Sequence, residues 1–217
     1  MVKAIAFDLD GTLINDTDIL IEAEVKAFMS KGAIVTYSEL RSHGGTSIKD
    51  LAKTFLKEVD DETIKDLRAL RKEEVLKNLD KIEVFQDTLP TLKKLKEKGI
   101  KLGIATGLGR DLLPLFLKKT GIDTYMAASV SADDVRMGKP APDVFLRAFE
   151  LMGVKPQEGL VVGDSKSDIK AAEAAKAPSI LIVRDGTPIC KSDYTIKDLG
   201  ELIEITTAIK LWPFQGS

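Results

Sequence analysis

The stretch AIAFDLDGTL, residues 4–13, decides how this chain folds. Four apolar residues lead directly into two acids, Asp8 and Asp10, and Gly11 then interrupts the run. Side chains two positions apart on a β-strand point to the same face. Asp8 and Asp10 therefore project together where a buried strand ends, although two like charges in one site repel each other.

Short apolar segments rich in Val, Ile and Ala recur along the chain, with helix-length stretches between them. Continuous apolar runs that alternate with amphipathic helices are typical of a parallel sheet covered on both faces. The sequence therefore predicts an α/β core. The predicted strands are residues 4–7, 101–106, 126–131, 159–163 and 179–183.

The first gap between strands is too long for a simple connection. Roughly 90 residues separate the first two predicted strands, whereas a crossover needs only about a dozen. We therefore assign residues 15–84 to an inserted helical cap, and residues 1–14 and 85–217 to the core. Within the cap, helical spacing of apolar residues predicts helices over 16–32, 46–59 and 60–79. The sequence leaves open whether the last residues, 211–217, belong to the fold.

Composition excludes several classes of function. The chain has 32 basic and 34 acidic residues, and its basic residues are not gathered with aromatic ones, so a nucleic-acid groove is not indicated. It lacks an apolar run of the roughly 20 residues that a membrane helix needs, and its N-terminus does not resemble a signal peptide. Cys190, the single cysteine, can form no internal disulfide. We expect a cytoplasmic monomer or homodimer that binds a small molecule, with no nucleic-acid or membrane partner.

Polar residues follow the later predicted strands where each strand ends. Thr106 and Gly107 end the second strand, Asp164 follows the fourth, and Asp168 comes one helical turn later. Lys139 lies in GKPAPD, where two prolines stiffen the backbone before a helix. Open parallel sheets bind ligands outside the carboxyl ends of their strands. These groups should therefore meet the two acids of the first strand at one edge of the sheet.

So many carboxylates cannot share a cleft in ionised form without a compensating charge. Hard oxygen ligands, with neither cysteine nor histidine nearby, favour Mg²⁺. With Asp8, Asp164 and Asp168 ionised, Mg²⁺ and Lys139 make the site about neutral if Asp10 is protonated. A protonated carboxyl is what a general acid requires. The hypothesis is that one aspartate attacks a substrate and its neighbour moves the proton.

In order along the chain, DLDGTL, the threonine after IA, GKPAPD and GDSKSD resemble the four motifs of the haloacid dehalogenase superfamily. The match is to its phosphoglycolate phosphatase and β-phosphoglucomutase-like members, which carry a helical cap after the first motif, and it covers nearly the whole chain. The resemblance implies a Rossmann-like core of three layers. It also implies a Mg²⁺-dependent phosphatase that acts on a small soluble phosphomonoester of the phosphoglycolate, sugar phosphate or nucleotide class.

The resemblance also implies catalytic roles. Asp8 would be the nucleophile that becomes an aspartyl-phosphate, and Asp10 would protonate the leaving alcohol and then deprotonate the water. Thr106 and nearby backbone amides would hold the phosphoryl oxygens, with Gly107 beside them. Lys139 would offset the negative charge of nucleophile and phosphate.

For the metal, the resemblance implies three ligands. Asp8, the backbone carbonyl of Asp10 and Asp164 would bind Mg²⁺, with Asp168 supporting them. Gly11 would let the chain turn away from the strand after the second acid. These assignments place the metal at the same sheet edge as the catalytic groups.

The cap should choose the substrate, because lids commonly close over a leaving group and exclude water. The turn LRSHGGTS resembles a specificity loop of the family. Gly44 and Gly45 would allow a close backbone approach, and Arg41 and His43 could reach a polar leaving group. The alternative is that these two side chains are ordinary exposed residues with no role in substrate binding.

The sequence departs from the family pattern in a few places. Gly107 stands where an asparagine is common, Gln86 and Asp87 stand where Pro-Gly is frequent, and Lys176 stands where a glycine often ends a helix. Asp16 resembles an acid common near the cap hinge. None of these changes touches the predicted carboxylates, threonine or lysine of the site.

Two other functions remain open at this point. A sugar phosphomutase of the same family keeps both aspartates of the first motif, although Thr12 after Gly11 favours hydrolysis. A catalytically idle binding protein would be expected to have lost one of the four key residues, Asp8, Asp10, Lys139 and Asp164, and all four are present.

Overall fold

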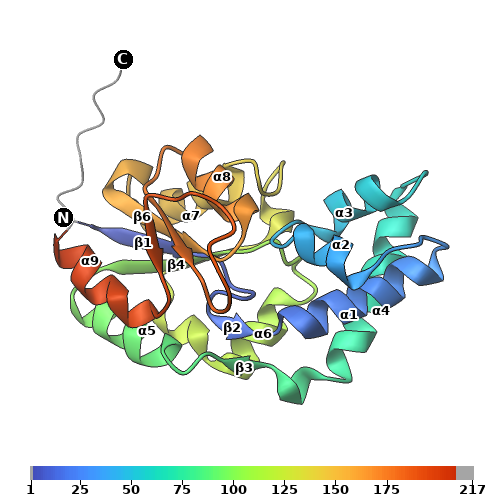
Figure 1. Cartoon of the computed structure of the whole chain (residues 1–217), viewed down its shortest axis with the longest axis horizontal. Coiled ribbons are helices and arrows are strands. Elements are labelled where there is room, and N and C mark those ends of the chain that lie inside the picture. Colours follow the sequence, from blue (N-terminus) through green and yellow to red (C-terminus); the bar gives the residue numbers. More distant parts are fainter. Residues whose placement is uncertain (1, 209–217) are drawn as a thin grey trace.

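The computed structural model describes residues 2–208, so residues 211–217 lie outside the described part of the chain. Its centre is a six-stranded sheet in the order β5-β4-β1-β6-β7-β8, in which all neighbours are parallel (Figure 1). The strands are β1 (Ala4–Phe7), β4 (Lys101–Ala105), β5 (Ala128–Val130), β6 (Gly159–Gly163), β7 (Ser179–Ile182) and β8 (Tyr194–Ile196). The predicted parallel α/β sheet is confirmed.

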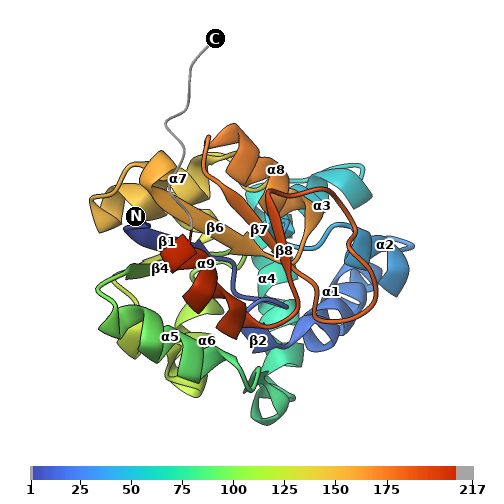
Figure 2. The same cartoon turned by 60° about the vertical axis from the view of Figure 1, so that its left-hand side comes forward.

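The sequence analysis missed β8, which lies at the edge of the sheet beyond β7 (Figure 2). Its three residues, YTI, contain one buried side chain, that of Ile196. An edge strand that is mostly exposed lacks the continuous apolar run that marks a central parallel strand.

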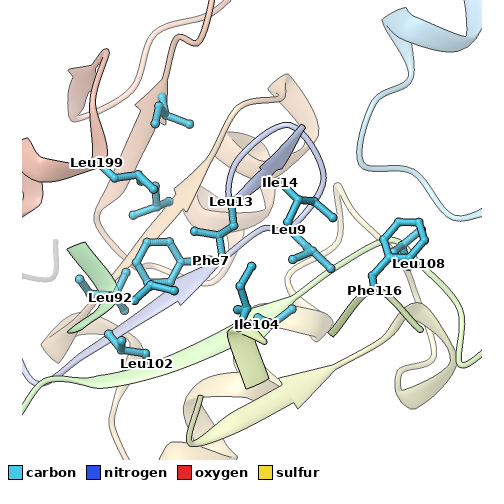
Figure 3. Packing of buried hydrophobic residues seen from close by; sticks show 14 of the residues in the cluster. Phe7, Leu9, Leu13, Ile14, Leu92, Leu102, Ile104, Leu108, Phe116 and Leu199 are labelled. Carbon is cyan, nitrogen blue, oxygen red and sulfur yellow. The ribbon is translucent and has the colours of Figure 1, made fainter. Parts of the chain in front are cut away.

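The alternating side chains of β1 divide the core into two layers. Ile5 and Phe7 point to one face, where Phe7 packs with Leu92 and Leu102 (Figure 3). Alanines 4 and 6 point to the other face, and their small side chains let helices approach closely. The first face is covered by α5 (Thr88–Glu97), α6 (Leu113–Thr120) and α9 (Leu202–Ala208), and the second by α7 (Asp143–Met152) and α8 (Lys166–Ala174).

Four helices lie to one side of this three-layer core (Figure 1). They are α1 (Thr17–Ser30), α2 (Tyr37–Ser42), α3 (Ile48–Phe55) and α4 (Asp61–Leu76), and they pack around a hydrophobic cluster of their own. The sequence analysis missed α2, although Thr36 and Glu39 form the capping box that marks its start. The helix predicted over 46–59 ends early, because Leu56 is extended.

Two chain crossings connect these helices to the sheet. At the crossings β2 (Ile14–Asn15) pairs antiparallel with β3 (Glu83–Val84). One guanidinium ties both crossings to the core, because Arg184 donates to Asp87 Oδ2 at 2.6 Å and to Thr12 O at 2.5 Å. Its centre also lies 3.9 Å from the Phe85 ring centroid. The assignment of residues 15–84 to a separate cap remains a proposal.

Short 3₁₀ helices complete the described chain. They are Leu79–Lys81, Ile122–Tyr125, Ala132–Asp134, Pro156–Glu158 and Leu199–Glu201. Within residues 2–208, none of the helices combines the length and apolar character required to cross a membrane.

The end of α8 yields a test of backbone strain. Lys176 has φ +55°, and the N–H groups of Lys176 and Ala177 donate to the carbonyls of Glu173 and Ala172, which closes the helix as a Schellman motif. Glycine adopts this left-handed conformation without the steric cost that other residues pay. We predict that Lys176→Gly raises the free energy of unfolding by about 1 kcal/mol in urea denaturation. The matched control Lys170→Gly, at an exposed position inside the same helix, should lower it by about 1 kcal/mol. A loss of stability in both variants would contradict the prediction.

Candidate active site

The site begins with a buried ion pair at the carboxyl end of β1. The Asp8 N–H donates to Val162 O on β6 at 2.8 Å, which fixes Asp8 at the sheet edge, and the residue is 1% exposed. Lys139 Nζ donates to Asp8 Oδ1 at 2.5 Å and lies 2.7 Å from Asp168 Oδ1. The lysine therefore sits between two buried carboxylates.

The start of α8 orients Asp168. Ser165 is the N-cap of this helix, and its N–H and Oγ donate to Asp168 Oδ2 at 3.1 and 2.5 Å. In return, the Asp168 N–H donates to Ser165 Oγ at 3.2 Å, which completes a capping box. Asp164 lies just before this cap and accepts a hydrogen bond of 3.0 Å from Thr12 Oγ1. The turn after β1 and the turn after β6 are thus joined directly.

Three carboxylates converge in a way that suits a divalent cation. Oxygen atoms of Asp8, Asp164 and Asp168 lie within 4.8 Å of one another. Burial, together with the charge of Asp168, raises the pKa of Asp8 well above its usual range and raises the pKa of Asp164 to about 7. Three carboxylates that share one ammonium, that of Lys139, leave the cluster short of positive charge. An all-oxygen donor set short of positive charge fits Mg²⁺.

The side chain of Asp10 lies apart from this cluster of three. Thr106 Oγ1 donates to Asp10 Oδ2 at 2.9 Å and accepts the Leu108 N–H at 3.0 Å. The Asp16 carboxyl, at the N-cap of α1, is buried beside Asp10. Burial raises the pKa of Asp10, and burial together with the charge of Asp10 raises that of Asp16 well above its usual range. Two neighbouring aspartates of one strand end thus have different surroundings.

Glycines bring the cap loop onto the rim of the site. Gly44 O accepts a hydrogen bond of 2.7 Å from Ser167 Oγ at the start of α8. A Cβ on Gly107 would lie within 3.0 Å of both the carbonyl carbon and oxygen of Gly45. The glycine in place of the common asparagine therefore has a steric reason. Gly11 has one too, because its φ is +77° and a Cβ there would lie 2.5 Å from Asp164 Oδ2.

Two of the predicted specificity residues are not brought to the carboxylates. Arg41 is exposed, with Nη1 3.6 Å from Asp18 Oδ1 and a 3.0 Å hydrogen bond to the Tyr37 hydroxyl. The His43 ring packs edge-on against Phe55, with 5.2 Å between ring centroids. Both side chains contact residues of α1, α2 or α3, so the backbone of the loop, and not these side chains, approaches the site.

Sequence reasoning missed Arg71, a buried residue of α4 that contacts Asp111 in the loop after β4. Its side chain is 1% exposed, and its charge lowers the pKa of Asp10. The sequence did carry a signal, because Leu67, Arg71 and Val75 repeat at four-residue spacing and all three are buried. A charged residue on the apolar face of a helix marks a buried ion or a site.

Comparison with known proteins places the chain among relatives. Residues 5–182 match the family model of the haloacid dehalogenase-like hydrolases. The chain is 30% identical to pyrophosphatase PpaX of Anoxybacillus flavithermus over 210 residues, which cover 94% of this chain and 96% of the relative. It is 31% identical to a phosphoglycolate phosphatase of Shigella boydii, with 82% and 80% covered. The crystal structure of a hydrolase from Pseudomonas syringae, 26% identical, matches with a TM-score of 0.84 over 95% of this chain and 98% of that one.

Gly107 yields a prediction about closure of the loop. Gly107→Asn places a Cβ against the backbone of Gly45, so the closed contact should be lost. Hydrogen exchange of the amides at residues 44–46 should then speed up by about tenfold or more, since an opening cost lowered by about 1.4 kcal/mol has that effect. Gly44→Ala is the matched control, because its Cβ would meet its nearest atom at 3.5 Å. Unchanged exchange in the Gly107 variant would rule out the contact.

The raised pKa values yield a prediction about stability and pH. The folded chain holds protons on Asp8 and Asp164 that the unfolded chain releases near pH 4. The free energy of unfolding of the metal-free chain should therefore fall as pH rises from about 4 to 7, by on the order of 2 kcal/mol. Urea denaturation at a series of pH values measures this slope, and Asp164→Asn should flatten it. Stability that rises over the same range would contradict the assignment.

Proposed function

This chain belongs to the haloacid dehalogenase-like hydrolase family, and from that membership we propose that it is a Mg²⁺-dependent phosphatase. Its substrate would be a small soluble phosphomonoester, and hydrolysis would proceed through an aspartyl-phosphate. Names of relatives, pyrophosphatase and phosphoglycolate phosphatase, support phosphoryl transfer to water. Location in the cytoplasm and a monomeric or dimeric state stay predictions.

The observation that carries the proposal is the different environment of two aspartates on one strand end. Asp8 faces Lys139 and two further carboxylates, whereas Asp10 faces Thr106 and Asp16. Different surroundings assign different protonation states to neighbouring carboxyls. Lys139 together with a bound Mg²⁺ would hold Asp8 as the carboxylate that attacks, and burial, which raises the pKa of Asp10, suits Asp10 to carry a proton.

In the first step an Asp8 carboxylate oxygen attacks phosphorus, and the bond between phosphorus and the leaving oxygen breaks. Asp10 gives its proton to that oxygen, so the leaving group departs with a neutral hydroxyl and not as an alkoxide. The Thr106 hydroxyl would donate to a phosphoryl oxygen once the substrate has displaced its bond to Asp10. The Lys139 ammonium offsets charge that gathers on the oxygens.

In the second step Asp10, now ionised, takes a proton from water, and the water oxygen attacks phosphorus. The bond between phosphorus and Asp8 breaks, which restores the carboxylate and releases inorganic phosphate. Asp10 is again protonated at the end of the cycle. The same carboxyl therefore serves as acid and then as base, as microscopic reversibility requires.

Bound Mg²⁺ would supply a positive charge that draws the phosphate toward Asp8 and lowers the repulsion between them. Asp8, Asp164 and the backbone carbonyl of Asp10 would hold it, with Asp168 also within reach of the cluster. Asp168 is fixed by Ser165 and Lys139, which suits it to support the metal ligands.

Phosphate release tests the proposal. We predict that the chain releases inorganic phosphate from members of a panel of small phosphomonoesters only when Mg²⁺ is present. Asp8→Asn keeps the shape of the side chain but removes the nucleophilic carboxylate, so release should fall by a factor of at least about 10³.

Asp123→Asn is the control, because Asp123 is an exposed acid that belongs to none of the motifs. It should leave release unchanged. Asp8→Asn with normal activity, in a chain that unfolds cooperatively, would refute the mechanism. Failure of the wild-type chain to release phosphate from any ester would refute the function and favour a mutase or a binding protein.

A further inference from the structure

Arg71 is a buried cation whose hydrogen-bonding capacity is largely unused. Arg71 Nη1 lies 3.3 Å from Glu24 Oε1 and Nη2 lies 3.5 Å from Asp111 Oδ2, distances at the outer limit of hydrogen bonding. Its Nε has no partner among the described residues, and neither does Asp111 Oδ1. A guanidinium has five N–H donors, and buried donors are normally satisfied. The side chain is therefore poised to accept a further partner.

Arg68, one turn earlier on the same helix, is a direct contrast. Its Nη1 donates to Asp133 Oδ2 at 3.0 Å, and its Nη2 is bonded to Asp133 Oδ1, so the pair is bidentate. The Arg110 N–H also donates to Asp133 Oδ2 at 2.9 Å. Arg68 thus fastens α4 to the core through both of its terminal nitrogens, although its Nε, like that of Arg71, has no partner among the described residues. Fastening the helix does not explain the loose contacts of Arg71.

Arg71 bridges the helices beside the core and the loop that carries Thr106. Its core partner, Asp111, lies in that loop after β4, and Thr106 Oγ1 donates to Asp10 Oδ2 at 2.9 Å. The charge of Arg71 also lowers the pKa of Asp10, the group proposed to protonate the leaving oxygen. The guanidinium is therefore joined through one loop to the group that the leaving oxygen contacts.

We propose that Arg71 is a specificity residue that binds an oxyanion on the leaving group, so that the preferred substrates are small phosphate compounds whose leaving group carries a negative charge. This inference rests on the proposed phosphatase function. The shared chemistry is a carboxylate or a phosphate oxyanion, which a guanidinium binds through two parallel N–H···O bonds.

The acidic neighbours of Arg71 hold it only loosely. Glu24 Oε1 stands 3.3 Å from Arg71 Nη1, and burial raises the pKa of Glu24. Asp111 is partly exposed and touches Arg71 only at 3.5 Å. An oxyanion that approached closer than these contacts would take over the free donors. Their looseness keeps the guanidinium oriented without satisfying it.

Paired substrates of similar size test the inference on the full chain. Phosphoglycolate and pyrophosphate have anionic leaving groups, and they separate the carboxylate from the phosphate source, whereas ethyl phosphate has a neutral leaving group. We expect the wild-type kcat/KM to favour at least one anionic substrate by about tenfold or more. Arg71→Met should lower kcat/KM for that substrate by about 10- to 150-fold, the range of a hydrogen bond to a charged group, and for ethyl phosphate by less than about fivefold.

Arg68→Met is the matched control, since it removes an arginine of the same helix face that has its partner already. This variant should lower kcat/KM for both substrate classes by the same factor, so the preference for an anionic leaving group stays unchanged. Arg71→Lys, which keeps the charge near Glu24 and Asp111, should restore part of the preference and guards against misfolding of the methionine variant. Thermal unfolding checks that each variant is folded.

Equal losses on both substrate classes in folded Arg71→Met, or a wild-type chain indifferent to leaving-group charge, would overturn the inference and leave the phosphatase function standing. Calorimetric titration with glycolate and with inorganic phosphate adds a readout that needs no turnover. Binding of either that weakens tenfold or more in Arg71→Met supports the inference even if no ester is hydrolysed. Absence of binding by both, or equal binding to wild type and variant, would overturn it.

Discussion

The burial of Lys139 between Asp8 and Asp168 is the interaction on which the rest of the site depends. The three residues come from the end of β1, the loop before α7 and the first turn of α8, so the ion cluster forms only when the sheet is assembled. Removing one member of such a cluster leaves a buried charge without its partner, which typically costs about 3–5 kcal/mol. The backbone hydrogen bond from Asp8 to Val162 holds Asp8 in place, and the hydrogen bond from Ser165 holds Asp168. The same three side chains therefore contribute both to the stability of the fold and to the reactivity of the site.

The sequence predicted most of this edge, because its geometry follows from the backbone alone. Parallel strands end at one edge, so residues placed just after apolar runs, such as Asp8, Thr106 and Asp164, must come near one another. Arg71 escaped prediction because its importance arises from contacts between α4 and the core, whereas Asp16 was noted only through the resemblance to the family. No strand pattern announces such contacts, although the buried spacing of Leu67, Arg71 and Val75 shows that helix periodicity can reveal a misplaced charge.

The junction between cap and core shows how a departure from the family pattern acquires a physical role. Asp87, at a position where Pro-Gly is frequent, accepts hydrogen bonds from Arg184 at 2.6 Å and from the Leu199 N–H at 2.7 Å. Arg184 also binds Thr12 O, and the Thr12 side chain binds Asp164. A charged network therefore links the second crossing to a proposed metal ligand. Where proline would stiffen the backbone locally, this chain uses side chains that connect five segments, those of Thr12, Asp87, Asp164, Arg184 and Leu199.

Different residues of the helical segment hold it against the core and are proposed to recognise the substrate. The backbone at Gly44 accepts a side-chain hydrogen bond from Ser167 on the core, and both terminal nitrogens of Arg68 are bonded to Asp133. These contacts depend only on the protein, so they can form whether or not a substrate is bound. Arg71 differs because its nearest carboxylates stand off at 3.3 and 3.5 Å. A ligand that satisfies the donors of Arg71 beside Asp111 would stabilise the contact between α4 and the loop after β4. Ligand binding and the packing of α4 on the core would then be coupled through one guanidinium.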